Sequence, residues 1–190
     1  MLVGVGVLLY LALWQKWLVV RDGPGEDVMD VAGVGLAFSG HVVRIWALTC
    51  IGTISRTTKL QAERVVKEGP YALVRHPLYV GNWMIACGLF VVARDALLLV
   101  VGPVLVLMWY LKISGEEEAF LRERFGKEYE DYAREVPRLF PRLKLRGVTF
   151  DVRRAIGFWT GTKEYQALIG TTVFIVAREM IEVVTRLRMG

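Results

Sequence analysis

Apolar residues along the N-terminal part of the chain form four long runs separated by short polar stretches. The runs cover residues 1–20, 28–54, 78–93 and 96–113. A helix needs about 20 mostly apolar residues to cross the hydrocarbon core of a bilayer, and the 78–93 run is the shortest of the four. The pattern therefore predicts an all-α, polytopic membrane protein with about four transmembrane helices.

Two features of the polar stretches predict how these helices are arranged. Only Arg94 and Asp95 separate the last two runs, so 78–93 and 96–113 should form a tight antiparallel helical hairpin. The 55–77 loop carries five Lys or Arg residues, whereas the 21–27 loop carries one. The positive-inside rule then places the N-terminus, the long loop and the C-terminal tail in the cytoplasm, where loop and tail can build one site.

The tail begins with a second kind of pattern. Apolar residues recur at steps of four, four, three and four, which is one face of a helix: Leu121, Phe125, Tyr129, Tyr132 and Val136. We expect an amphipathic cytoplasmic helix that Pro137 and Pro141 end.

The later apolar run, 167–177, is too short to span a membrane and predicts an interfacial or packed helix, with a fifth crossing less favoured. We treat 145–190 as a C-terminal helical extension, and the sequence leaves open its role and whether 167–184 enters the membrane.

Composition and charge support a membrane protein and exclude several other classes. The chain has 190 residues, of which 54% are apolar, and its mean hydropathy is +0.41. The net charge is +5, but the cations lie between or after the apolar runs, which indicates topology and anionic lipid rather than nucleic acid. Cys50 and Cys87 lie inside apolar runs without metal-ligand spacing, so neither a disulfide framework nor a metal site is expected.

The stretch GPYALVRHPLYVGN, residues 69–82, is the first candidate site. Gly69-Pro70 indicates a turn, His76 before a proline should be extended, and Pro77 suits the first position of a helix. A helix N-terminus favours an anionic group, and Arg75 adds a cation beside it. The alternative is that Arg75 is a topology signal and His76 a lipid headgroup contact.

Two further groups of ionisable residues allow a structural or a functional interpretation. Glu116, Glu117 and Glu118 should open the tail helix, where its dipole favours acids, but three carboxylates also suit a cationic or amine-bearing ligand. His41 and Arg44 lie three apart within an apolar run and so share a helical face. They either form a buried pair tied to other helices or line a functional path.

Two blocks of sequence resemble a known family. EGPYALVRHPLYVGN resembles the G-P-Y-x-x-x-R-H-P-x-Y-x-G signature of the isoprenylcysteine carboxyl methyltransferase family. EEEAFLRERFGKEYEDYAREVPRLFP resembles that family's second block, and RIWALTCIG is similar to a looser segment upstream of the first block. The likeness covers about residues 40–142, and the order and spacing of the two main blocks make it specific.

The resemblance implies an integral membrane methyltransferase that uses S-adenosylmethionine at the cytoplasmic face and acts on a lipophilic or prenylated acceptor. Its core would be residues 1–144, with the cofactor site formed by 69–82 and 114–142. The cofactor-binding residues carried over are Tyr71, Arg75, His76, Pro77, Tyr79, Gly81, Glu117 and Glu118. Glu117 is also a catalytic candidate, and Arg44 or Arg138 could hold an acidic group of the acceptor.

The resemblance does not select the acceptor. A carboxylate or thiolate acceptor needs only alignment and desolvation, which would explain the absence of a catalytic dyad, whereas an amine acceptor could use a glutamate as base. Other functions also fit the pattern: a phospholipid N-methyltransferase, an NADPH-dependent lipid reductase with a related core, or a small transporter or scaffold with a path lined by His41 and Arg44. The sequence leaves the oligomeric state open.

Overall fold

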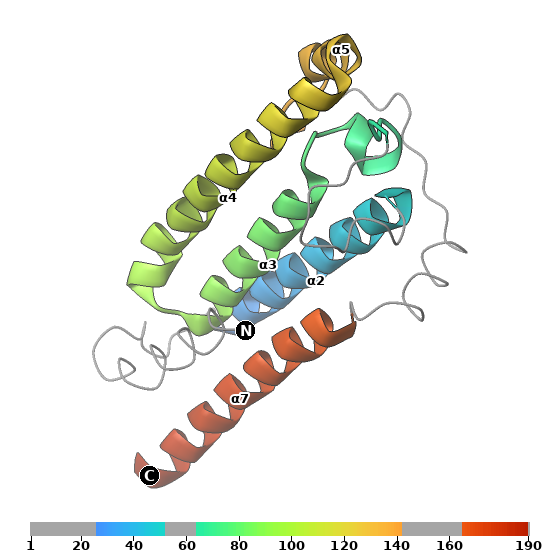
Figure 1. Cartoon of the computed structure of the whole chain (residues 1–190). Helices are drawn as coiled ribbons and strands as arrows, with labels where there is room; N and C mark the ends of the chain where they lie inside the picture. The colour runs from blue at the N-terminus through green and yellow to red at the C-terminus, as the bar shows by residue number, and fades with distance from the viewer. Residues whose placement is uncertain (1–25, 52–63, 142–164, 190) are drawn as a thin grey trace.

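We analysed a computed structural model of the chain that describes residues 26–51, 64–141 and 165–189. The predicted helix at 1–20 lies outside these residues. The elements are α2 (Glu26–Ile51), the 3-10 helix η2 (Gly69–Ala72), α3 (Pro77–Ala93), α4 (Ala96–Phe125), α5 (Lys127–Glu135) and α7 (Tyr165–Met189). Helices α4, α3, α2 and α7 lie side by side in this order across Figure 1. These helical elements confirm the all-α prediction for the described residues.

The hairpin between α3 and α4 is confirmed, and local chemistry explains both of its ends. Pro77 occupies the first position of α3, after His76. Helix α3 ends where Arg94 adopts a left-handed conformation with φ of 53°, and the Asp95 side chain then caps α4 by accepting from the Leu98 amide. Helices α2 and α4 are long and apolar enough to span a membrane, whereas α3 is shorter. The number of crossings stays a prediction.

Helices α2 and α3 pack closely because glycines face each other at two levels. A Cβ placed on Gly88 would lie 2.5 Å from the carbonyl oxygen of Gly33, and one placed on Gly40 would lie 2.6 Å from that of Gly81. The pairs are separated by seven residues on each helix and run in opposite directions, as expected for antiparallel helices. The small residues let the backbones approach as they do in many membrane helix pairs.

Helix α4 corrects the prediction for the acidic run. It continues for 30 residues without a break, so Glu116, Glu117 and Glu118 lie inside it rather than at the start of a tail helix. The sequence after the apolar part consists of good helix formers, and the break comes only at Gly126, which has φ of 52°. The helix dipole therefore does not account for the three acids. The predicted amphipathic face is divided between α4 and α5, which ends at Glu135 before Pro137.

Helix α7 is longer than the apolar run that predicted it. It extends from Tyr165 to Met189, past the charged residues Arg178 and Glu179. It packs against α2 and α3 on the side away from α4 (Figure 1), so the packed helix that the sequence predicted is present.

Candidate active site at the start of α3

The buried carboxylate of Glu118 lies at the centre of the site. Its side chain is 1% exposed, although it follows the apolar part of α4 by only one to two turns. Four cationic or potentially cationic side chains contact its two oxygens: Arg138 at 2.9 Å, Arg75 and His76 at 3.0 Å, and Arg122 at 3.2 Å. We call these five residues the Glu118 cluster. Because all its acceptor positions are engaged, Glu118 holds the surrounding chain together.

The backbone around the cluster fixes the first block of the motif against the chain that follows α5. The amide of Arg75 donates to the Pro137 carbonyl at 2.9 Å, and the amide of His76 donates to the Arg138 carbonyl at 3.2 Å. The Tyr132 hydroxyl donates to the Tyr71 carbonyl at 2.8 Å. The extended strip that the sequence predicted before Pro77 is therefore paired with residues some sixty positions away, which a turn signal alone does not reveal.

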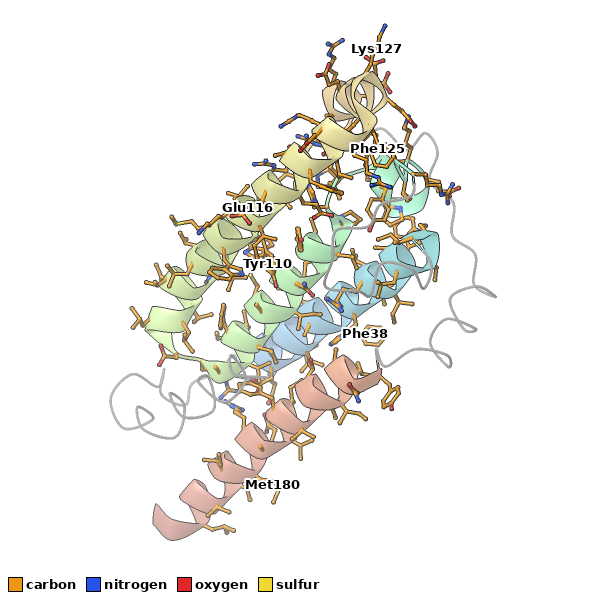
Figure 2. All side chains as sticks on the ribbon, viewed as in Figure 1. Phe38, Tyr110, Glu116, Phe125, Lys127 and Met180 are labelled. Carbon is orange, nitrogen blue, oxygen red and sulfur yellow. The ribbon has the colours of Figure 1, made fainter. Side chains whose placement is uncertain are left out.

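Glu117 has a different environment from its neighbour. Its side chain is 33% exposed, accepts a hydrogen bond from the Tyr79 hydroxyl at 3.0 Å and lies 3.5 Å from Nδ1 of His76. The Tyr79 ring stacks between those of His76 and Tyr110, with centroid distances of 5.5 and 5.0 Å. Figure 2 shows Tyr110 on the side of α4 that faces α3. A carboxylate next to stacked rings can receive a cationic, partly aromatic ligand.

The cluster shifts the proton affinities of two groups in opposite directions. Burial alone would raise the pKa of Glu118, but hydrogen bonds from His76 and Arg138 and the charge of Arg75 outweigh it and lower the pKa to about 2. Burial alone would lower the pKa of His76, but its contacts with Glu117 and Glu118 outweigh this effect and the pKa is raised. Glu118 is therefore ionised at neutral pH, and His76 retains its proton to higher pH than a free histidine.

Arg44 lies next to this site within the helical bundle. It donates to the Asn82 side-chain oxygen on α3, and Asn82 lies close to the Tyr110 hydroxyl. His41 contacts another helix, with Nε2 3.0 Å from the Thr171 hydroxyl of α7. The two residues that share a face of α2 thus contact different neighbours, α3 and α7. A path lined by both is not supported by these contacts.

The structure brings most of the predicted site residues together. Arg75, His76, Tyr79, Glu117, Glu118 and Arg138 form one contiguous group. Tyr71 and Pro77 are buried in the framework, and Gly81 lies against Gly40 and the Arg44 side chain between α2 and α3. Whether these residues bind a cofactor stays a prediction.

Sequence reasoning missed three contributors to the site. Arg122 follows Glu118 by four residues and Tyr110 precedes Glu117 by seven, so helical spacing could have indicated both once α4 was known to be continuous. Tyr132 belongs to the second block and to the predicted apolar face, but nothing local indicates that its hydroxyl reaches Tyr71.

The chain is similar in sequence to one family model and to several known proteins. A family model described as phospholipid methyltransferase matches residues 28–128. The chain is 33% identical over 131 residues to the cobalt-zinc-cadmium resistance protein CzcN of Cupriavidus metallidurans, covering 69% of this chain and 56% of that protein. It is 29% identical over 133 residues to a probable protein-S-isoprenylcysteine O-methyltransferase of Oryza sativa subsp. indica (68% and 64%). The corresponding rat protein is 30% identical over 120 residues (61% and 42%). The chain therefore spans about half the length of the curated relatives it matches.

Proposed function

Because the chain belongs to the phospholipid methyltransferase family and is a relative of the protein-S-isoprenylcysteine O-methyltransferases, we propose that it transfers a methyl group from S-adenosylmethionine to a lipophilic acceptor. The observation that carries the proposal is the contrast between two adjacent acids. Glu118 is buried and saturated by cations, whereas Glu117 is partly exposed beside three stacked rings. The first organises the site, and the second is available to a ligand.

The donor set fits the chemistry of the cofactor. Glu117 would take the ammonium group or the ribose hydroxyls, and the rings of His76, Tyr79 and Tyr110 would lie against cationic or aromatic parts. Arg138 keeps a third of its side chain exposed and would take the carboxylate together with the start of α3. When bound, S-adenosylmethionine supplies a methyl group on a positively charged sulfur, which becomes a thioether as the methyl group passes to the acceptor.

We favour a carboxylate on a lipophilic molecule, such as a prenylated cysteine, as the acceptor. A carboxylate is nucleophilic when ionised, so the protein has only to align it and exclude water. A series of neighbouring side chains leads from the Glu118 cluster into the bundle: His76, Tyr79, Tyr110, Asn82 and Arg44. In this proposal Arg44, the last of these side chains, holds the acidic group of an acceptor that enters from the membrane.

A phospholipid amine is the second candidate, because the family model is described as a phospholipid methyltransferase. An amine attacks only when neutral, and Glu117 would then accept its proton. For either acceptor, we place the Glu118 cluster at the cytoplasmic face. The cations of the 55–77 loop and of the tail support this orientation through the positive-inside rule.

Binding of S-adenosylhomocysteine to the full chain tests the proposal. In calorimetry, we expect saturable binding that Glu117→Gln weakens by roughly tenfold or more, because one charged hydrogen-bond partner is lost. Glu123→Gln is the matched control, since Glu123 is exposed on the same helix. The proposal fails if the wild-type protein binds no S-adenosylhomocysteine in detergent or in lipid.

The acceptor is identified by the chemistry of the product. Vesicles containing the protein, methyl-labelled cofactor and either a farnesylated cysteine or phosphatidylethanolamine would be compared. A carboxyl methyl ester releases its label as methanol in mild base, whereas an N-methyl group does not. Base-labile product on the farnesylated cysteine supports the carboxylate acceptor, and stable product on the phospholipid alone would replace it with the amine.

A further inference from the structure

Helix α7 lies outside the region matched by the family model, yet it is tied to the bundle at two depths. Near its start, the Thr171 hydroxyl lies 3.0 Å from Nε2 of His41, and both side chains are buried. Further along, the guanidinium of Arg178 lies 3.6 Å from the Asp30 carboxylate. Polar ties of this kind hold membrane helices together, where the alternative is a polar group facing hydrocarbon.

The order of these ties fixes the direction of α7. Residue numbers rise from Thr171 to Arg178 while those of their partners fall from His41 to Asp30. Helix α7 is therefore antiparallel to α2 and parallel to α3, as Figure 1 shows. The tied positions are about 10 Å apart along α7 and about 16 Å apart along α2, and the long side chain of Arg178 spans the difference.

Arg178 lies at the end of the bundle opposite the Glu118 cluster. Its partner Asp30 also binds Arg94, which is buried in the turn between α3 and α4. From Tyr165 to Arg178 the helix rises about 20 Å, compared with about 25 Å for α3. The part of α7 from Tyr165 to Arg178 is thus nearly as long as α3, and its two polar contacts place it beside α2 between His41 and Asp30. The charge of Arg178, which ends the apolar run, is paired with Asp30 inside the structure.

We propose that α7 crosses the membrane in contact with α2 and α3, and that its C-terminal end emerges on the face opposite the Glu118 cluster. This replaces the interfacial helix and the wholly cytoplasmic tail that the sequence favoured. In this arrangement the start of α7 lies on the face of the Glu118 cluster, and the end of α7 lies on the same face as the start of α2. The inference does not depend on methyl transfer.

Single cysteines test the arrangement in the full chain after Cys50 and Cys87 are replaced by alanine. Lys127→Cys at the start of α5 reports the face of the cluster, and Leu187→Cys reports the end of α7; both positions are exposed. A membrane-impermeant maleimide is applied to sealed right-side-out and inverted vesicles. We expect Lys127→Cys to react in one type of vesicle and Leu187→Cys in the other.

Asp27→Cys, at the exposed start of α2, is the matched control and should react in the same vesicles as Leu187→Cys. Reaction of Leu187→Cys in the same vesicles as Lys127→Cys overturns the proposal, whatever the result of the methyl-transfer assays. If Leu187→Cys is not recovered in membranes, Met180→Cys tests the same end of α7, because Met180 is also exposed and follows Arg178 by two residues.

Discussion

The adjacent carboxylates of Glu117 and Glu118 have different surroundings, although they are only one residue apart. Successive side chains on a helix point about 100° apart, so Glu118 is directed into the cluster while Glu117 is directed toward Tyr79. Removing the charge of Glu118 would leave three arginines without their central partner. Residues with the same chemistry thus have different roles, which depend on the direction in which α4 presents them.

The opposite pKa shifts of Glu118 and His76 predict how stability varies with pH. The pKa of Glu118 is about 2, below its ordinary value of about 4.3, so its stabilisation is present above pH 4.3 and is lost as the pH falls toward 2. The pKa of His76 is raised above about 6.5, so its stabilisation is present below that pH and is lost as the pH rises through the raised value. The cluster is therefore most stabilising between about pH 4.5 and 6.5.

Melting temperatures of the detergent-solubilised protein from acidic to mildly alkaline pH check this prediction. His76→Gln should abolish the contribution of His76 to the decline above pH 6.5 while leaving a decline below pH 4.5. Equal slopes for wild type and His76→Gln on the alkaline side would show that His76 does not carry the charge inferred for it.

For individual residues, the sequence correctly predicted that the first block and the acidic run lie together. The sequence could not show which glutamate is buried, because that depends on the rotation of α4 relative to α3. In the structure Gly81 packs against α2, and its predicted role at the cofactor stays a prediction.

The close packing of α2 against α3 depends on glycines, which have no side chain to separate the two backbones. Gly33, Gly40, Gly81 and Gly88 let the two backbones touch, while Gly35 on the outer side of α2 has no neighbour within 4 Å of a Cβ placed on it, among the atoms that the structure describes. The same residue type is therefore required at four positions and dispensable at one.

Gly88→Ala should lower the free energy of unfolding by about 1–3 kcal/mol, because its Cβ would collide with the backbone of α2. Gly35→Ala should change it by no more than about 1 kcal/mol, in the stabilising direction, since alanine favours the helix and meets no obstacle. Denaturant unfolding of both variants in the same detergent provides the measurement. A Gly88→Ala protein as stable as wild type would mean that the helices are further apart than described.

At the scale of the whole molecule, α2 and α3 lie between α4, which carries the cluster, and α7, which lies outside the family match (Figure 1). The cluster and the Asp30–Arg94–Arg178 contacts lie at opposite ends of this assembly. The two ends therefore depend on separate ion pairs, and one can be loosened without the other.

Arg178→Met should increase amide hydrogen exchange in α7 by roughly tenfold, because the charged contact with Asp30 is lost, and should leave exchange in α4 and α5 unchanged. Arg134→Met is the control, because the contacts of Arg134 with Glu130 and Asp131 on α5 are exposed and of little energetic value. Exchange followed by mass spectrometry on the two variants distinguishes the outcomes. An equal increase in α4 would show that α7 supports the entire bundle.

The sequence by itself determined the helical class, the hairpin at Arg94–Asp95, the start of α3 at Pro77 and the two blocks that form the site. These features depend on local rules: hydrophobic run length, turn residues and the fixed backbone of proline. Tertiary structure alone decided that Glu118 is buried by four partners and that α7 packs antiparallel to α2. Each of these depends on contacts between residues distant in the chain, whose geometry periodicity and spacing do not encode.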